Sequence, residues 1–265
     1  MPDRLLTALL LGDVVGQAGC RGLVLLLPGL IKQYDADLVV VNGENAADGY
    51  GITPDMVEKF YHAGVSVITS GNHVWQQKEI LPLLEGEERL LRPYNYPKGV
   101  PGHGLCLVEV RGHKVGVVNL QGRVRMSNIL CPFLGGKEVA RKLKKDTNVI
   151  LVDFHAEDPE EKEALGMYLD GEVSVVFGTH THVQTADERI LPKGTAYITD
   201  IGMIGPSNSV IGFKPQIALQ RSLTQLPIKM EVDDGLALIQ GIVVTLEEST
   251  GRARSIERIR VASTV

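Results

Sequence analysis

Apolar residues along this chain form short runs that alternate between strand-like and helix-like spacing. Residues 5–11 read as a buried strand, and residues 16–34 read as a helix with leucines at 23, 26, 27 and 30. Strands are predicted at 38–41 and 65–69, and Thr53-Pro54-Asp55 predicts the start of a helix between them. This strand–helix–strand–helix–strand order predicts a parallel sheet.

The pattern changes after residue 90, where Pro, Gly and Tyr predict an ordered loop to residue 104. A β-hairpin is predicted at 105–110 and 114–119, then a helix near 137–145 and strands at 149–154 and 173–177. Between those strands, Asp158-Pro159-Glu160-Glu161 has the form of a capping box and starts a helix that runs to about residue 169. Beyond 185 we expect mainly β-structure, with a loop at 202–212, a helix near 215–224 and closing strands at 241–246 and 255–261. The simplest architecture is a single domain over residues 1–265, with two sheets packed together and helices outside them.

Composition narrows the functional class. The chain has 265 residues and a net charge of −5, with no dense basic patch for extended nucleic acid or a membrane surface, although a small nucleotide needs only a local site. Three distant cysteines without metal-binding spacing fit a reducing cytoplasm without disulfides. The apolar stretch near the N-terminus is too short for a signal sequence and lacks an A-x-A site, and no apolar run reaches transmembrane length.

Five predicted strands lead directly into residue types that bind metal ions. These residues are Asp13 after LLLG, Glu44 and Asn45 after LVVVNG, Asn72 with His73 after VITSG, His155 after VILVDF, and His180 with His182 after VVFGT. They offer carboxylate, imidazole and carboxamide groups, with no thiolate among them. The pattern predicts a site for hard-to-borderline metal ions at one edge of a sheet.

Each of these residues also has an ordinary structural interpretation. Asp13 can cap the following helix, Glu44 and Asn45 can form a turn, and His155 can be a hydrogen-bonded core histidine. The pair His180 and His182 carries the most weight, because residues i and i+2 share a face of extended backbone. Asp153 lies two residues before His155 and is expected on the same face, where it can orient the imidazole ring. The remaining histidines, at 62, 103 and 113, are expected at the surface or in the hairpin.

Taken in order, six stretches resemble the calcineurin-like metallophosphoesterases, and more closely the YmdB family of bacterial phosphodiesterases. They are GDVVG at 12–16, VNGENAADG at 41–49, SGNHVW at 70–75, DFHAE at 153–157, GTHTHVQTAD at 178–187 and DIGMIGP at 200–206. The resemblance implies an α/β four-layer sandwich, in which two mixed β-sheets pack face to face and are flanked by helices. It also implies hydrolysis of phosphoesters, with 2′,3′-cyclic nucleotides as a family substrate. Unlike the broad superfamily, the chain has Asp13-Val14-Val15 in place of Asp-x-His, and Glu44 in place of the bridging aspartate.

The resemblance further implies two metal ions, which would clamp the phosphate and acidify a bound water. Glu44 would bridge them; Asp13, Asn45 and His182 would complete one protein shell, and Asn72, His155 and His180 the other. Fe or Mn is favoured and Zn is possible, and His73 would be the general acid. The expected partner is a small phosphoester, a cyclic nucleotide above all, with no membrane and no extended nucleic-acid groove. A homo-oligomer is left open.

Two other classes compete with this hypothesis. A non-catalytic nucleotide- or metal-binding regulatory protein on the same fold would keep the ligands without turnover. An amidohydrolase barrel also uses H-x-H, but early in the chain, whereas here the motif follows four other ligand sites. Whether the 202–212 loop, Arg123 or Arg125 contacts phosphate or base is not decided by the sequence, and neither are the physiological substrate, the metal and the oligomeric state.

Overall fold

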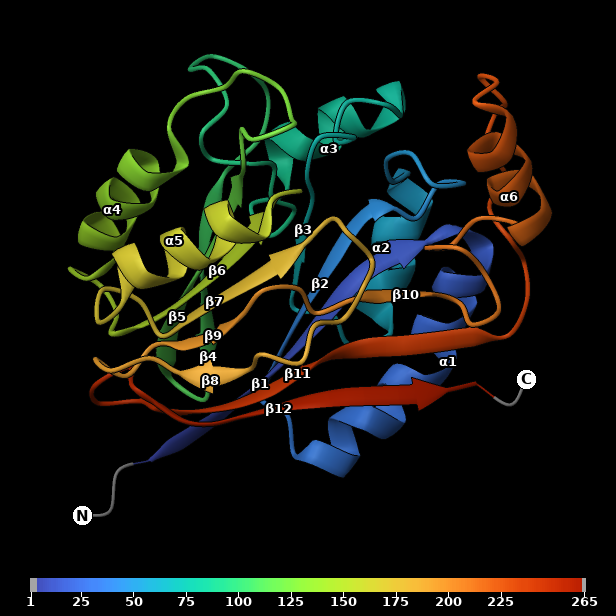
Figure 1. Ribbon diagram of the computed structural model, residues 1–265. Helices are drawn as coiled ribbons and strands as arrows, with labels where there is room; N and C mark the ends of the chain where they lie inside the picture. The colour runs from blue at the N-terminus through green and yellow to red at the C-terminus, as the bar shows by residue number, and fades with distance from the viewer. Residues whose placement is uncertain (1–3, 264–265) are drawn as a thin grey trace.

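The computed structural model describes residues 4–263, which are built around two six-stranded sheets (Figure 1). In spatial order, the first sheet contains β12 (Ala253–Ala262), β11 (Ala237–Glu247), β10 (Met203–Pro206), β1 (Leu5–Val15), β2 (Leu38–Asn45) and β3 (Val67–Thr69). The second sheet contains β4 (Leu105–Val110), β5 (His113–Gln121), β6 (Val149–His155), β7 (Val175–Thr179), β9 (Ala196–Ile198) and β8 (Arg189–Ile190). Strands β1, β2 and β3 are parallel, as predicted.

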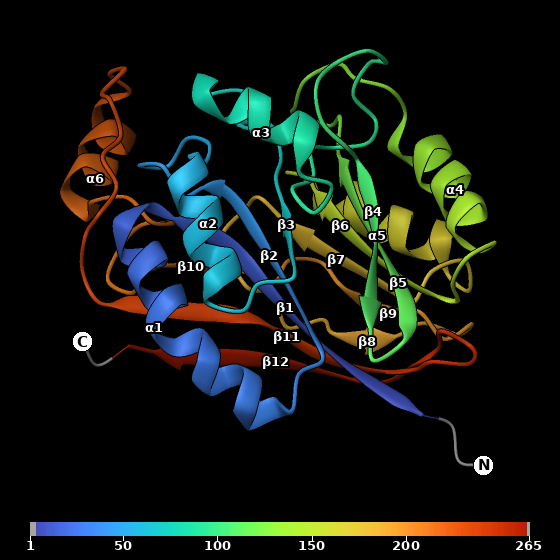
Figure 2. The ribbon, with the colours of Figure 1, turned by 180° about the vertical axis from the view of Figure 1, so that it is seen from behind.

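Helices cover the outer faces of both sheets, which gives the predicted four layers (Figures 1 and 2). The helices are α1 (Gly16–Tyr34), α2 (Pro54–His62), α3 (Leu81–Gly86), α4 (Pro132–Leu143), α5 (Pro159–Leu169) and α6 (Pro215–Thr224), with a 3₁₀ turn η1 (Lys78–Ile80) before α3. One apolar cluster joins α1, α2 and α3 to the first sheet, and another joins α4 and α5 to the second. Helix α6 stands apart, with Ala218 as its one buried residue. Among residues 4–263, no helix is both long and apolar enough to cross a bilayer.

A third apolar cluster fills the space between the sheets. Alternate residues of each strand point into it, because successive side chains of a strand face opposite ways. In β2 these inward residues are Leu38 and Val40, and in β6 they are Val149 and Leu151. This register decides which later residues of the same strands point into the molecule.

Two predicted helix starts are confirmed in atomic detail. The Thr53 side chain accepts a hydrogen bond from the backbone N–H of Met56 at the start of α2. The Asp158 side chain accepts one from the N–H of Glu161 at the start of α5. The predicted capping box is only half formed, since the Glu161 carboxylate accepts the backbone N–H of Arg123 (3.0 and 3.1 Å).

Several predicted boundaries were wrong. Strands β1, β2 and β6 run on through the polar residues that were expected to follow them, to Val15, Asn45 and His155. The predicted loop at 202–212 contains β10, which pairs with both β1 and β11. Helix α4 begins at Pro132, five residues before the predicted start at 137, and η1 was not predicted.

Candidate metal centre

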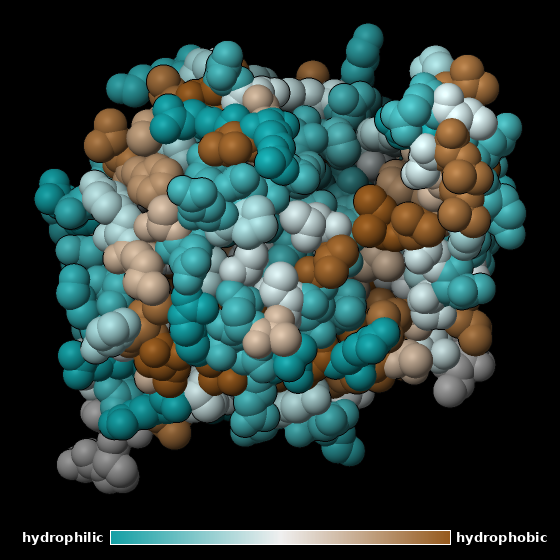
Figure 3. All heavy atoms as spheres, in the orientation of Figure 1, coloured by the Kyte–Doolittle hydropathy of each residue, from teal (hydrophilic) through white to brown (hydrophobic). Residues whose placement is uncertain are grey.

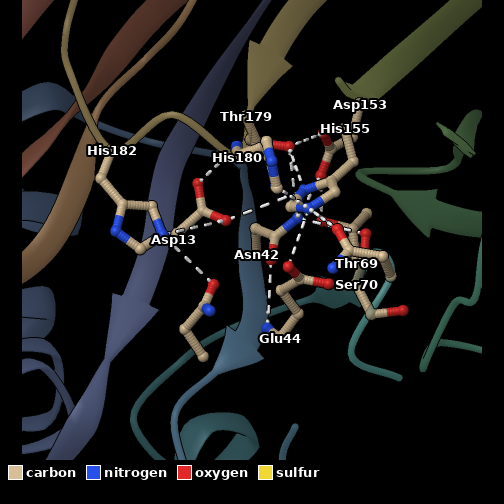
Figure 4. A network of polar contacts seen from close by, with 12 residues as sticks. Asp13, Asn42, Glu44, Thr69, Ser70, Asp153, His155, Thr179, His180 and His182 are labelled. Atoms are coloured by element: carbon tan, nitrogen blue, oxygen red, sulfur yellow. Dashed lines mark hydrogen bonds and ion pairs between the residues drawn. The ribbon is translucent and has the colours of Figure 1, made fainter. Parts of the chain in front are cut away.

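The carboxyl ends of the strands carry a buried polar layer between the two sheets. Along β2 the inward positions change from Leu38 and Val40 to Asn42 and Glu44, all of them buried. Three strands of the second sheet change in the same way. The buried polar residues at their ends are Asp153 and His155 in β6, Thr179 in β7, and Asn119 and Gln121 in β5. The candidate metal centre lies in this layer (Figure 4).

A β-bulge turns Asp13 into the layer. The even-numbered residues 6, 8 and 10 of β1 face the inter-sheet core, so strict alternation would put residue 13 on the outer face. The pairing of β1 with β2 shifts between Leu11 and Asp13, and the Asp13 carboxylate consequently faces inward. Gly12 is required here, because a Cβ would overlap the Gly202 carbonyl, which accepts a hydrogen bond from the Asp13 N–H (3.2 Å).

A first group of ligand atoms surrounds Nε2 of His155. This nitrogen lies 2.8 Å from Oε1 of Glu44, 3.0 Å from Nδ1 of His180 and 3.2 Å from Oδ1 of Asn72. Ligand atoms of Glu44, His155 and His180 all lie within 4.8 Å of one another. Oε1 of Glu44 is buried, and apart from the imidazole nitrogens it has no hydrogen-bond donor. Converging acceptor atoms of this kind form a site that fits a cation.

The charged groups around His155 also favour a cation at this position. Burial by itself lowers the pKa of His155, but the carboxylates of Glu44, Asp13 and Asp153 outweigh it and raise that pKa to about 9. Burial likewise opposes ionisation of Glu44, yet His155 and His73 lower its pKa to about 2. The buried carboxylates therefore stabilise a positive charge on the His155 ring. A metal ion bound at this position would supply that positive charge instead.

A second group of ligand atoms lies beside the first. Nε2 of His182 is 3.4 Å from Oδ1 of Asn45 and 4.0 Å from Oδ1 of Asp13. Nδ1 of His182 donates to the carbonyl of Ile211 (2.8 Å), so in the neutral ring Nε2 keeps its lone pair. Asn45 Nδ2 donates to the Gly49 carbonyl (2.9 Å), which aims the amide oxygen at His182. Oδ1 of Asp13 is buried without a hydrogen-bond partner, and burial raises the pKa of this carboxyl.

The two histidines of the H-x-H motif converge for a different reason than predicted. β7 ends at Thr179, and the backbone φ angles of His180 and His182 are +96° and +64°, so the expectation of extended backbone was wrong. Such left-handed residues are disfavoured and need outside support. Part of that support is Asp13, whose Oδ2 accepts the backbone N–H of His180 (3.1 Å). Glu157, which sequence reasoning missed, lies 3.2 Å from Nε2 of His180.

His73 borders the first group without joining it. Its Nδ1 lies 3.5 Å from Oε1 of Glu44 and 3.3 Å from Nδ2 of Asn45, and its ring meets the Tyr50 ring edge-on at 5.1 Å. Its backbone N–H donates to Oε2 of Glu44 (3.0 Å). Burial lowers the pKa of His73, Glu44 opposes this, and His155 adds to the lowering. The structure thus brings all eight predicted site residues to one place.

Beneath the ligand atoms lies a network of which sequence reasoning identified only Asp153. The Thr179 hydroxyl donates to Oδ1 of Asp153 (2.7 Å) and therefore accepts from Nδ1 of His155 (2.9 Å). Oδ2 of Asp153 accepts from the Thr69 hydroxyl and from Nδ2 of Asn42 (3.0 Å). Asp153 shares a face with His155, as predicted, and it orients that ring through Thr179. Inward polar positions on apolar strands were the signal that could have identified these residues.

Gly71 allows the loop after β3 to pass close to the site. A Cβ at this position would overlap the His155 ring and Oε2 of Glu44. Only glycine therefore lets the backbone that carries Asn72 and His73 approach the other ligand atoms without displacing them.

The remaining histidines and Arg123 lie outside the candidate metal centre. His62 and His113 are exposed, as expected, and His113 pairs with Glu248 (2.8 Å), whereas His103 is half-buried in the loop before β4. Arg123 directs its guanidinium to Sγ of Cys131 (3.5 Å). The 202–212 loop, in contrast, reaches the site through the Ile211 carbonyl, which binds His182.

Comparisons with known proteins identify related chains. The sequence is 43% identical over 253 residues to a 2′,3′-cyclic-nucleotide 2′-phosphodiesterase of Bacillus subtilis (strain 168), covering 96% of each chain. A solved structure of a novel phosphatase from Mycoplasma pneumoniae has a TM-score of 0.92 at 37% identity, covering 98% of this chain and 94% of that one. A hypothetical protein from Thermus thermophilus has a TM-score of 0.89 at 38% identity, covering 97% of this chain and 100% of that one. The model of the YmdB-like protein family matches residues 9–259, and this chain belongs to that family.

Proposed function

We propose that this chain is a metal-dependent phosphodiesterase that hydrolyses 2′,3′-cyclic nucleotides or related small phosphodiesters. The observation that carries the proposal is the buried cluster around His155, in which one oxygen each of Asp13 and Glu44 faces imidazole nitrogens and no other hydrogen-bond donor. Anionic oxygens buried in this way are strongly destabilising without a cation. The similarity to a cyclic-nucleotide phosphodiesterase over nearly the whole chain supports the reaction class.

The donor set fits two metal ions. Asp13, Asn45 and His182 would hold one, and Asn72, His155 and His180 the other, with Glu44 between them. Seven ligands are too many for one ion that also keeps a position for substrate or water. Oxygen and nitrogen donors without thiolate suit Fe or Mn, and also Zn. Two such ions would offset the charge of a phosphodiester and lower the pKa of a coordinated water.

The protein residues have separable tasks in this scheme. Thr179, held by Asp153, fixes the His155 ring through Nδ1 and leaves Nε2 free. The Ile211 carbonyl does the same for His182. His73 lies beside the ligand atoms and would donate the proton that the leaving ribose oxygen requires.

The test is turnover by metal-reconstituted protein of a panel of cyclic nucleotides, linear phosphodiesters and phosphomonoesters. We expect 2′,3′-cyclic nucleotides to be the best substrates, and His155→Ala to abolish turnover. His62→Ala, at an exposed histidine at the end of α2, is the control and should behave like the wild type. Full activity of His155→Ala, or of chelated protein, would refute the metal-dependent mechanism.

Elemental analysis distinguishes two bound metal ions per chain from one. We expect metal content to approach two ions per chain after saturation with Mn or Fe. A plateau at one ion would refute the binuclear assignment. Metal and nucleotide binding without turnover of any panel member would instead favour the regulatory protein.

A further inference from the structure

A cavity of about 550 Å³ opens directly onto the candidate metal centre. One side is polar and includes Asn45, His73, His180 and His182. The rest of the lining is mostly apolar and includes Tyr50, Val210, Ile211, Phe213 and Met230, with Arg221 beside them. The volume lies within the usual range for small-ligand sites, and an apolar wall facing a few polar groups is their usual form.

The apolar side comes mainly from the segment between β10 and β11, which we call the 207–236 segment. It begins with a tight turn in which Val210 and Phe213 exchange backbone hydrogen bonds (2.9 and 3.0 Å). Ile211 and Gly212, at the corner of the turn, both have positive φ angles. The Ile211 carbonyl binds His182, so the turn is fixed directly to the candidate metal centre.

Apolar side chains stay exposed around this cavity. Tyr50, Val210 and Ile211 retain 41, 42 and 44% of their accessible surface. Figure 3 shows apolar side chains gathered on the side of this face where α6 stands. Contiguous exposed apolar surface next to a polar site marks a place where a ligand binds. Arg221 from α6 also lines the cavity and supplies hydrogen-bond donors.

We propose that the wall formed by Phe213, Ile211, Tyr50 and Arg221 is the subsite for the nucleobase of the substrate; this inference rests on the proposed function. In a 2′,3′-cyclic nucleotide the base is attached at C1′, next to the carbon that bears the reacting 2′ oxygen. A phosphate held at the candidate metal centre therefore brings the base into the adjoining cavity. Aromatic rings bind the faces of bases by stacking, and Arg221 can donate to a carbonyl or ring nitrogen on the base edge.

The test compares two cyclic phosphodiesters that undergo the same ring opening. One is 2′,3′-cyclic AMP, and the other is glycerol 1,2-cyclic phosphate, which has no base. We expect Phe213→Ala to lower kcat/KM for 2′,3′-cyclic AMP by about 5- to 150-fold, the range for loss of one base–aromatic stack. The loss for glycerol 1,2-cyclic phosphate should be several-fold smaller. Arg221→Ala, at an exposed position of α6, should show the same selectivity if Phe213→Ala fails to fold.

Leu223→Ala is the control, because Leu223 lies on the same helix, is 83% exposed and does not line the cavity. It should leave both substrates unchanged. Equal losses on both substrates would mean that the wall acts on the candidate metal centre through His182, and would overturn the base subsite. The base subsite would also be overturned if the Phe213 and Arg221 variants keep their rates but have a lower oligomeric mass. The wall would then be an interface between copies of this chain.

A binding measurement keeps this inference separate from the proposed function. If the wild type turns over neither substrate, the proposed function fails. Affinities of metal-loaded protein for adenosine 3′-monophosphate and for inorganic phosphate still test the subsite. Phe213→Ala should weaken the first and spare the second, and equal effects on both would refute the subsite.

Discussion

Lys162 and Asp200 form an ion pair in the interior, with Nζ 2.7 Å from Oδ2 and both side chains about 1% exposed. Lys162 also donates to the carbonyl of Thr179 (2.8 Å), and Oδ2 of Asp200 accepts from the N–H (3.2 Å) and hydroxyl (2.8 Å) of Thr181. The pair therefore holds the backbone on both sides of His180, whose φ of +96° needs outside support. Through this backbone, both residues position His180, which is one of the proposed metal ligands.

Replacing Lys162 by methionine should destabilise the protein by about 3–5 kcal/mol, because Asp200 is left buried and unpaired. Lys144→Met is the matched control: its ion pair with Glu172 has a similar length (2.8 Å), but both side chains are more than a third exposed. That pair should contribute less than about 1 kcal/mol. Denaturant unfolding of both variants measures the difference, and equal losses would contradict a structural role for the buried pair.

Gly71→Ala should fold but bind metal poorly. The new methyl group would push the His155 ring and the Glu44 carboxylate apart. We expect Mn affinity to fall by about 10- to 100-fold, the range for losing groups that orient a ligand. Gly29→Ala in α1 is the control, since a Cβ there meets open space and a helix gains up to about 1 kcal/mol from the change. Metal titration of both variants, at equal helix content, measures the difference in metal affinity. Unchanged affinity in Gly71→Ala would argue against the close approach of the Gly71 backbone to His155 and Glu44.

Much of the fold was predictable because its strands follow simple rules. Apolar runs such as 149–154, bounded by turns and helix caps, predict buried strands, and the order of the first five elements fixes parallel pairing. β10 was missed because Met203–Pro206 contains Gly and Pro, which usually indicate a loop. β10 forms a strand because β1 and β11 lie on either side of it and supply its hydrogen-bonding partners. Only the tertiary structure brings these partner strands together.

The candidate site was predictable in its residues and not in its geometry. Residue type and position after apolar runs identified Asp13 and His182, but alternation alone would have turned Asp13 outward. The bulge at Gly12 depends on the Gly202 carbonyl, which lies far along the chain. The orientation of His182 likewise depends on Ile211, since one carbonyl selects which ring nitrogen stays free. Contacts between distant segments set these features, and no local pattern encodes them.

Metal binding should release protons at neutral pH. The carboxylates beside His155 raise its pKa to about 9, so the ring is protonated at pH 7 and must lose that proton to bind a cation. We expect roughly one proton released per chain from this ring at pH 7, and metal affinity that rises with pH until about 9. Isothermal titration of Mn in two buffers of different ionisation enthalpy gives the proton count. A count near zero at pH 7 would show that His155 is not a ligand, or is neutral beforehand.

His73 lies beside two of the proposed ligands, with its Nδ1 3.3 Å from Nδ2 of Asn45 and 3.5 Å from Oε1 of Glu44. If it is a proton donor and not a ligand, His73→Ala should keep its full metal content and its fold. Its rate on a 2′,3′-cyclic nucleotide should fall by about 10²–10⁴, the range for loss of a general acid. Elemental analysis of the variant checks the first expectation, and steady-state kinetics checks the second.

The size of the loss in His73→Ala should depend on the leaving group. A ribose alkoxide leaves poorly without a proton, whereas a nitrophenolate is stable enough to leave unaided. The ratio of wild-type to variant rate should therefore be much larger for a 2′,3′-cyclic nucleotide than for a nitrophenyl phosphodiester at matched metal occupancy. Equal ratios would mean that His73 positions the substrate by some other contact. Loss of a metal ion together with the side chain would mean that His73 is itself a ligand.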